Sequence, residues 1–258
     1  MFNYQAPTSL LKDRVILVTG AGDGIGRAAA KCYASHGATV VLAGRTVKKL
    51  EQVYDEIEAS GAPQPAIIPI NLEGAAAHEY ETLAATLEQE FGRLDGLLNN
   101  AGVLGQRTPI ENYDPCIWNQ VMQVNLNAQF YLTQALLPLL QQSDDGSIVF
   151  TSSGVGRKGR AFWGAYAVSK FALEGFAQVL ADELEGLGTL RVNCINPGAT
   201  RTSMRAFAYP AENPAALATP ESIMPLYLYL MGPDAKGVTG HSIDAQGNGS
   251  PASLQGGQ

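Results

Sequence analysis

Short apolar runs rich in β-branched residues alternate along the chain with longer amphipathic segments. The first run covers residues 15–18, and a helical pattern follows over 24–36. Strands that are apolar throughout are typical of parallel sheets, and their alternation with helices predicts a doubly wound α/β fold. We therefore expect one parallel sheet of about seven strands with helices on both faces. The expected strands are 15–18, 39–43, 66–70, 96–98, 147–150, 190–195 and 242–244, and the first three helices are 24–36, about 46–60 and one ending near residue 91.

The whole chain, residues 1–258, is expected to form a single domain. No linker rich in proline, glycine or serine divides it, and no segment is repeated. Folds of this class and length commonly form one unit. Residues 200–220 are rich in alanine and proline and follow the sixth expected strand, which is where a lid over a ligand crevice would lie. Residues from about 247 onward are expected to form a flexible tail.

Residues 116–143 carry no charged side chain, yet they are rich in asparagine and glutamine. A membrane helix would not tolerate so many amides. The pattern instead favours a pair of helices packed against the sheet and against a partner subunit. We therefore expect a homodimer or homotetramer that forms through these helices and through the helix of residues 164–186.

The composition argues against several classes of protein. The net charge of −7 and the pI near 5.0 speak against nucleic-acid binding and against adhesion to anionic membranes. The N-terminus lacks a signal-peptide pattern, and no apolar run approaches membrane-spanning length. Cys32, Cys116 and Cys194 have no metal-type spacing and the three histidines are far apart, so no metal site or His-based triad is expected. Reduced cysteines favour a cytoplasmic location.

A glycine-rich loop follows the first expected strand and opens the first helix. It reads Thr19-Gly20-Ala21-Gly22-Asp23-Gly24-Ile25-Gly26. Glycines let the backbone turn sharply and approach a pyrophosphate, and the following helix directs its free N–H groups at the phosphates. The alternative is a tight strand–helix turn without a ligand. The position of the loop favours a dinucleotide site, in which we expect Gly20, Gly22, Asp23, Gly24, Ile25 and Gly26 to take part.

The end of the second expected strand bears on which dinucleotide binds. NAD-binding sites place a carboxylate there to hold the ribose hydroxyls, whereas this chain has Gly44 followed by Arg45. Arg45 can pair with a 2′-phosphate and stack on the adenine. Asp23 occupies a position where some NADP enzymes carry a basic residue, which leaves the selection to Arg45. We expect NADP(H) rather than NAD(H), the alternative being that Arg45 is only a solvated residue at a helix start.

Further motifs follow along the chain in a fixed order. They are Asn99-Asn100-Ala101-Gly102, Val124-Asn125, Ser152-Ser153, Tyr166-Ala167-Val168-Ser169-Lys170, and Asn196-Pro197-Gly198 with Thr202 beyond it. Together with the loop spacing T-G-x-x-x-G-x-G, this ordered set resembles the short-chain dehydrogenase/reductase family from about residue 12 to 247. Within that family, residues 152–157 and 163–166 are similar to the YciK-type bacterial oxidoreductases.

The resemblance implies a catalytic tetrad of Asn125, Ser153, Tyr166 and Lys170. Ser153 is thirteen residues before Tyr166, the separation expected in this family, and Ser152 stays the alternative. The resemblance also implies cofactor contacts by Asn100, Ala101, Gly102, Tyr166, Lys170, Pro197, Gly198, Thr200 and Thr202. At Asn71-Leu72 the family usually has Asp-Leu next to the adenine, and an amide oxygen can accept the same hydrogen bond.

This set of residue types suits hydride transfer to a carbonyl. The transfer leaves negative charge on oxygen, which must receive a proton. Tyr166 and Lys170 are four residues apart and share one face of a helix. A positive charge about 4 Å away is worth about 4 kcal/mol at an effective dielectric near 20, enough to lower a tyrosine pKa by about 3 units. We expect Lys170 to lower the pKa of Tyr166, the alternative being an ordinary helix pair. Ser153 would donate to the substrate oxygen, and the resemblance implies that Asn125 holds a water linking Lys170 to solvent.

The expected function is therefore that of an NADP(H)-dependent oxidoreductase acting on a carbonyl or alcohol. The alternatives are a nucleotide-sensing protein that binds NADP without turnover and a sugar-nucleotide epimerase or dehydratase. Phe162 and Trp163 line the substrate pocket, pack under the lid or pack against another subunit. Five cations bracket the expected site and bind an anionic substrate, form a solvated rim or contact another subunit: Arg157, Lys158, Arg160, Arg201 and Arg205.

Overall fold

A seven-stranded sheet, all parallel, forms the centre of the computed structural model, which describes residues 1–255. The strand order is β3-β2-β1-β4-β5-β6-β7. The doubly wound fold expected from the sequence is confirmed, with every strand within two residues of its predicted bounds. The strands are β1 (Val15–Thr19), β2 (Thr39–Gly44), β3 (Ala66–Pro69), β4 (Gly96–Asn99), β5 (Gly146–Thr151), β6 (Leu190–Asn196) and β7 (Ser242–Asp244).

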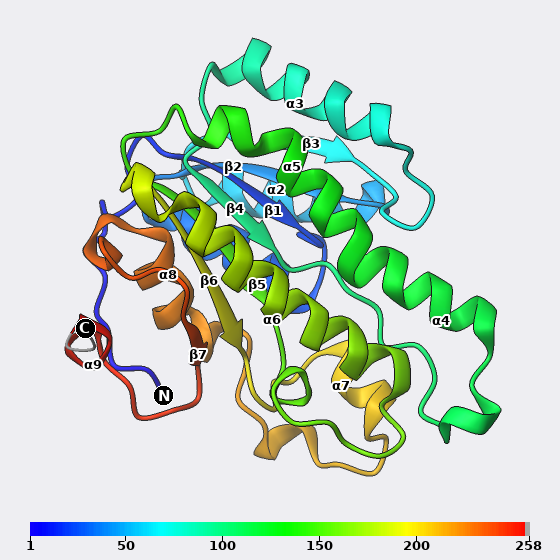
Figure 1. Cartoon of the computed structure of the whole chain (residues 1–258). Helices are drawn as coiled ribbons and strands as arrows, with labels where there is room; N and C mark the ends of the chain where they lie inside the picture. Colours follow the sequence, from blue (N-terminus) through cyan, green and yellow to red (C-terminus); the bar gives the residue numbers. More distant parts are fainter. Residues whose placement is uncertain (256–258) are drawn as a thin grey trace.

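Helices cover both faces of this sheet (Figure 1). Residues of α1, α2 and α8 pack into one core cluster with one face, and residues of α3, α5 and α6 pack into a second cluster with the other. The helices are α1 (Gly24–Ser35), α2 (Val47–Ala59), α3 (Ala77–Phe91), α4 (Pro115–Met122), α5 (Ala128–Leu140), α6 (Gly164–Leu184), α7 (Ser203–Ala208), α8 (Met224–Met231) and α9 (Pro251–Gln255).

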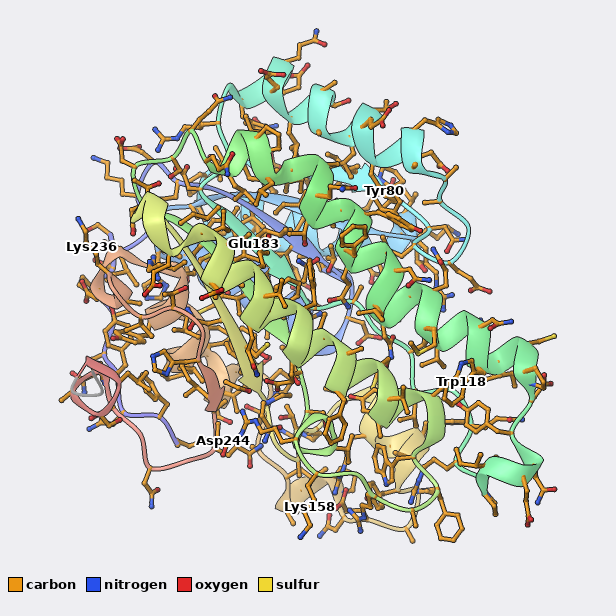
Figure 2. The ribbon with its side chains drawn as sticks, viewed as in Figure 1. Tyr80, Trp118, Lys158, Glu183, Lys236 and Asp244 are labelled. Atoms are coloured by element: carbon orange, nitrogen blue, oxygen red, sulfur yellow. The ribbon has the colours of Figure 1, made fainter. Side chains whose placement is uncertain are left out.

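The two clusters explain why β1 and β2 are apolar at almost every position. Successive side chains of a strand point to opposite faces. In β1, Ile16 and Val18 enter the cluster with α1, whereas Val15 and Leu17 enter the cluster with α3 and α5. On that second face, α3 and α5 lie side by side, and Tyr80 of α3 lies between them (Figure 2). Its ring is 5.9 Å from that of Tyr131 in α5, measured between centroids.

The strand order places a crevice at the carboxyl ends of β1 and β4. The chain runs outward from β1 through β2 to β3, and then returns to β4 on the other side of β1. Where the loops after two neighbouring strands run in opposite directions, a crevice opens between them. Ligands of open α/β sheets bind in such a crevice. The glycine-rich loop leaves β1 there, and the loop from residue 100 leaves β4.

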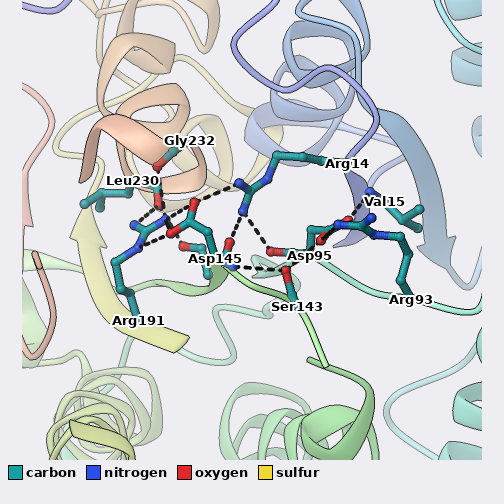
Figure 3. Close-up of polar contacts among 10 residues, drawn as sticks. Arg14, Val15, Arg93, Asp95, Ser143, Asp145, Arg191, Leu230 and Gly232 are labelled. Atoms are coloured by element: carbon teal, nitrogen blue, oxygen red, sulfur yellow. Dashed lines mark hydrogen bonds and ion pairs between the residues drawn. The ribbon is translucent and has the colours of Figure 1, made fainter. Parts of the chain in front are cut away.

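At the opposite end of the sheet, buried charges join the starts of four strands (Figure 3). Arg14, just before β1, pairs with Asp145 at 2.8 Å and donates to the main-chain oxygen of Asp95 at 3.2 Å. Arg191 of β6 pairs with the same Asp145 at 3.2 Å and donates to the carbonyls of Leu230 and Gly232. These contacts fasten β1, β4, β5 and β6 together on the side away from the crevice.

Two predicted segments differ from their expected form. The segment from residue 247 to 255 is in part ordered: Gly249 accepts a hydrogen bond from the main chain of Asn3, α9 begins at Pro251, and Leu254 packs against the core. The prediction of a tail flexible from residue 247 is therefore not supported as far as 255, and its last three residues lie outside the described part. In 116–143, α4 and α5 are joined by a π-helical turn, η2 (Gln123–Asn127).

None of the helices in residues 1–255 is long and apolar enough to span a bilayer. Likewise, no group of three or more His, Cys, Asp or Glu side chains within these residues could hold a metal ion. The cytoplasmic location stays a prediction.

Candidate active site

The glycine-rich loop turns tightly between β1 and α1. Gly20 and Gly24 have φ of 66° and 52°, a region that L side chains rarely adopt. A side chain at Gly26 would collide with the carbonyl of Gly20, so the first turn of α1 lies directly against the loop. Asp23 is the N-cap and accepts from the N–H of Gly24 at 2.7 Å. The loop thus leaves backbone N–H groups free at the start of α1, as a phosphate site requires.

A cavity of about 660 Å³ runs from this loop across the carboxyl ends of the strands. Its size lies within the range of small-molecule sites. It brings together nearly all the predicted site residues: Gly20, Gly22, Asp23, Gly24, Ile25, Gly44, Arg45, Asn71, Leu72, Asn100, Ala101, Gly102, Ser153, Tyr166, Lys170, Pro197, Gly198, Thr200 and Thr202. Gly26 and Asn125 do not line it, because Gly26 lies beneath the loop and Asn125 is fully buried behind the cavity wall.

Near the end of β2, the cavity is lined by a basic side chain that the sequence analysis missed. Lys49 of α2 pairs with Asp23 at 2.7 Å, and this contact lowers the pKa of the Asp23 carboxyl. Arg45 is mostly exposed, with Glu73 at 4.0 Å as its acidic neighbour. The position of Lys49 in the first turn of α2, four residues after Arg45, was the signal that could have identified it. Lys49 offsets the negative charge that Asp23 brings to the loop.

At the other end of the cavity, Tyr166 and Lys170 project from the first turns of α6. Both are buried, at 8% and 3% exposure. The ammonium of Lys170 donates to the carbonyl of Thr151, at the end of β5, at 2.6 Å. It also lies over the Tyr166 ring, 5.8 Å from the centroid. The lysine is thus held by the sheet rather than by the tyrosine hydroxyl.

This placement corrects the expected effect of Lys170 on Tyr166. Burial raises the pKa of Tyr166, and a hydrogen bond from Ser153 opposes the rise in part. The net shift of the Tyr166 pKa is therefore upward, and the ammonium of Lys170 binds the Thr151 carbonyl and faces the ring. Burial also lowers the pKa of Lys170 to about 8, against the opposing effects of Cys194 and Glu174.

Ser152 and Ser153 both line the cavity, but their surroundings differ. Ser153 is the N-cap of the 3₁₀ turn η3 (Gly154–Gly156), accepts from the N–H of Val155 at 3.5 Å and hydrogen-bonds Tyr166. Ser152 is fully buried, and its hydroxyl has no partner among residues 1–255. Only Ser153 has a hydrogen bond to the tyrosine in this arrangement.

Asn125 fastens the loop that leaves β4. Its Oδ1 accepts from the N–H of Val103 at 2.8 Å, and its Nδ2 donates to the Val103 carbonyl at 2.9 Å and to the Ser169 hydroxyl at 3.1 Å. Gly102 lies between Asn125 and Lys170, since a Cβ there would be 3.3 Å from Oδ1 and 3.8 Å from Nζ. The side chain of Asn125 therefore positions the loop beside Lys170. The water expected at this residue stays a prediction.

Helix α7 lies in the segment predicted to form a lid, and its residues Met204, Phe207 and Ala208 line the cavity together with Trp163. The lid role of this segment stays a prediction. Gln246, which the sequence analysis missed, holds the base of the segment by donating to the carbonyls of Pro197 at 2.9 Å and Ala199 at 3.0 Å.

The five cations predicted near the site separate into different roles. Arg157 pairs with Asp244 at 2.7 Å and lies 3.7 Å from Glu174, so it fastens the loop after Ser153 to β7 and α6 and is not a free anion-binding residue. Arg205 pairs with Glu212 at 2.6 Å. The remaining three are exposed: Lys158 (Figure 2), Arg160 and Arg201.

Comparisons with known proteins agree with this arrangement. Residues 14–213 match the family described as short chain dehydrogenase. The chain is 55% identical to the oxidoreductase YciK of Escherichia coli (strain K12) over 253 residues, which cover 98% of this chain and all of that protein.

Solved structures show the same fold at high identity. A short chain dehydrogenase from Pseudomonas syringae is 61% identical, with a TM-score of 0.92 over 95% of this chain and all of that one. A short chain dehydrogenase from Escherichia coli CFT073 complexed with NADPH is 56% identical, with a TM-score of 0.92 over 94% of this chain and all of that one.

Proposed function

Since the chain belongs to the short-chain dehydrogenase family, we propose that it is an NADP(H)-dependent oxidoreductase that interconverts a carbonyl compound and its alcohol. The observation that carries the proposal is the meeting of Tyr166, Ser153 and Lys170 at one end of a cavity whose other end is a glycine-rich loop. A catalytic group of this kind next to a phosphate-binding loop suits a reaction that needs both a dinucleotide and a proton donor.

The residues that line the cavity fit such a cofactor. The turn at Gly20 and Gly24 offers backbone N–H groups to a pyrophosphate, and Arg45 and Lys49 supply positive charge where a 2′-phosphate would lie. The structure of the Escherichia coli CFT073 relative, complexed with NADPH, supports the choice of NADP(H). When bound, the cofactor supplies the hydride that reduces the carbonyl carbon.

Each catalytic side chain then has a separate task. The Tyr166 hydroxyl donates its proton to the carbonyl oxygen as negative charge develops there. The Ser153 hydroxyl donates a hydrogen bond to the same oxygen and fixes its position beside the tyrosine. Lys170, held by the Thr151 carbonyl, keeps a positive charge near the reacting groups. Asn125 holds the β4 loop against Lys170.

Conversion of Tyr166 to phenylalanine tests this function. A panel of aldehydes and ketones is screened by the loss of NADPH absorbance, and the best substrate is used to compare the two proteins. Loss of the proton donor is expected to lower kcat by about 10²–10⁴-fold, while the affinity for NADPH in calorimetry stays within about threefold. A variant that keeps substantial activity would exclude Tyr166 as the proton donor. NADPH binding without turnover of any carbonyl would favour the nucleotide-sensing alternative.

A further inference from the structure

A second, shallow pocket of about 430 Å³ lies beside the proposed substrate end of the cavity. The loop after β4 and the end of α7 form it, and it shares Gly105, Phe207 and Ala208 with the main cavity. The rest of its lining is polar: Gln106, Arg107 and Thr108. Arg107 is the one ionisable side chain among these residues, and the sequence analysis did not single it out.

The guanidinium of Arg107 is held in place by two aromatic rings and one carbonyl. It lies 5.1 Å from the ring centroid of Trp163 and 4.6 Å from that of Tyr209, and it donates to the carbonyl of Ala208. No carboxylate within residues 1–255 forms an ion pair with it. A guanidinium has five N–H donors, so most of them stay available for a ligand.

The neighbouring cations do not fill the same role. Arg205 also lies over the ring of Tyr209, 3.9 Å from its centroid, but Glu212 balances the charge of Arg205. Arg160 donates to the Tyr209 hydroxyl at 3.1 Å. These contacts hold Tyr209 in place under Arg107. The result is an ordered positive charge without a counter-charge, in a protein whose net charge is −7.

Trp163 connects this charge to the proposed proton donor. Its ring contacts both the guanidinium of Arg107 and the ring of Tyr166, the latter at 5.6 Å between centroids. The guanidinium and the tyrosine therefore contact the same indole. The main cavity, which Trp163 and Tyr166 line, also has apolar side chains in its wall, among them Leu104, Met204 and Phe207.

We propose that the pocket at Arg107 is an anion subsite, and that the substrate is a carbonyl compound with a short apolar body and an anionic group that pairs with Arg107. The carbonyl end of this substrate rests on the proposed function, and its anionic end rests on the second pocket. A carboxylate or a phosphate would receive two parallel N–H donors from the guanidinium, which also orients the carbonyl toward Tyr166.

A matched pair of substrates tests the subsite. Para-formylbenzoate and its methyl ester have the same shape near the aldehyde and differ in charge. The wild type is expected to reduce the carboxylate with a kcat/KM about tenfold higher or more, the size of a charge-assisted contact. Arg107→Gln is expected to remove most of this preference by raising KM for the carboxylate. Arg201→Gln is the control, because it removes the same charge from an exposed position of the lid segment that lines neither pocket.

Two kinetic outcomes would overturn the subsite. An equal loss for both substrates in Arg107→Gln would mean that Arg107 only holds α7 in place through the Ala208 carbonyl. An equal loss of the preference in Arg201→Gln would mean that general attraction by the lid, and not a defined contact, selects the anion.

Calorimetry separates this inference from the proposed function. Para-formylbenzoate is titrated into NADPH-loaded Tyr166→Phe, with and without Arg107→Gln. Binding that falls about tenfold with Arg107→Gln supports the subsite even if the wild type reduces neither aldehyde, a result that would count against carbonyl reduction alone. Binding that does not depend on Arg107 excludes the subsite, whatever the turnover.

Discussion

Burial acts in opposite directions on the two titratable side chains of α6 that face the cavity. It raises the pKa of Tyr166 and lowers the pKa of Lys170 to about 8. Both changes favour the uncharged form. Tyr166 therefore keeps its proton well above neutral pH, which is the state that reduction of a carbonyl requires. Lys170 still carries its charge at neutral pH and loses it as the pH rises.

These shifts predict the pH dependence of carbonyl reduction. The rate should be nearly constant below about pH 8 and fall above it, because the positive charge of Lys170 disappears while Tyr166 stays protonated. The measurement is kcat with saturating NADPH from about pH 6 to about pH 10, a range that extends to roughly the ordinary pKa values of tyrosine and lysine. Lys170→Met should lower kcat and have no descending limb near pH 8. The same limb in that variant would assign it to a group other than Lys170.

We predict that Arg45 selects the cofactor. Arg45→Ser should raise the KM for NADPH by about 10–100-fold, the loss expected for a charge-assisted contact, and change the KM for NADH by less than about threefold. Lys48→Ser is the matched control, because Lys48 is an exposed neighbour that does not line the cavity. If the KM for NADPH rose equally in both variants, or in neither, Arg45 would not select the 2′-phosphate.

At the scale of strands and helices, the two ends of the sheet have different tasks. The carboxyl ends carry the cavity, whereas the amino ends are joined by buried charges (Figure 3). Asp95, before β4, is central to this network. It accepts from the N–H of Val15 at 2.9 Å, from Ser143 at 2.6 Å and from Arg93 at 2.6 Å.

Asp95→Asn is therefore expected to lower the free energy of unfolding by about 1–3 kcal/mol, because an amide has one acceptor oxygen and cannot serve Arg93, Ser143 and Val15 together. Asp144→Asn, an exposed neighbour, should change it by less than about 0.5 kcal/mol. Urea unfolding followed by tryptophan fluorescence measures both. Equal stability of the two variants would show that the network contributes little.

The same carboxyl gives the stability a pH dependence. Burial alone would raise the pKa of Asp95, but hydrogen bonds from Arg93, Ser143 and Val15 outweigh it and hold the pKa below its ordinary value. Its contribution is thus present above the unfolded pKa of about 3.9 and is lost as the pH falls through the lower folded value. Asp95→Asn should show less of this loss in acid than the wild type.

Patterns local in sequence predicted the strands and the cavity well, for a physical reason. Strands buried on both faces are largely apolar, so β1 and β2 are visible as short runs, and the loops at the carboxyl ends of parallel strands lie on the same side of the sheet. Side chains whose role depends on distant partners were missed or misassigned. Arg107 acquires its place from the rings of Trp163 and Tyr209. For Arg157 the sequence left open an anionic substrate, a solvated rim or a subunit contact, but Asp244 and Glu174, far along the chain, bind it.

The pKa of Tyr166 shows a second limit of sequence patterns. A spacing of four residues correctly placed Tyr166 and Lys170 near each other, but it gave no information about burial or about the Thr151 carbonyl. Burial and the Thr151 carbonyl together determine how the Lys170 ammonium is placed relative to the Tyr166 hydroxyl. Helical spacing predicts proximity of side chains, and the direction of a pKa shift depends on the surrounding solvent and dipoles.

At the scale of the whole molecule, the outer face of α5 and α6 carries large apolar side chains. The two helices cross one face of the molecule next to each other (Figure 1). Their inner sides enter the core, whereas five side chains on them are partly exposed: Phe130, Tyr131, Val168, Phe171 and Val179. An apolar surface of this kind favours association, and its position agrees with the interface expected from the uncharged segment 116–143 and the helix 164–186.

We therefore predict a homodimer or homotetramer that uses this face. Sedimentation of the wild type should give a mass at least twice the 27.3 kDa of one chain. Val179→Glu together with Phe171→Glu should shift the equilibrium toward the single chain, because a symmetric interface presents each substitution twice and buries unpaired charges of the same sign. Val47→Glu alters a comparably exposed apolar side chain on α2, across the sheet, and should leave the mass unchanged. A wild type that sediments as a monomer, or a doubly substituted protein that keeps the wild-type mass, would place any interface elsewhere.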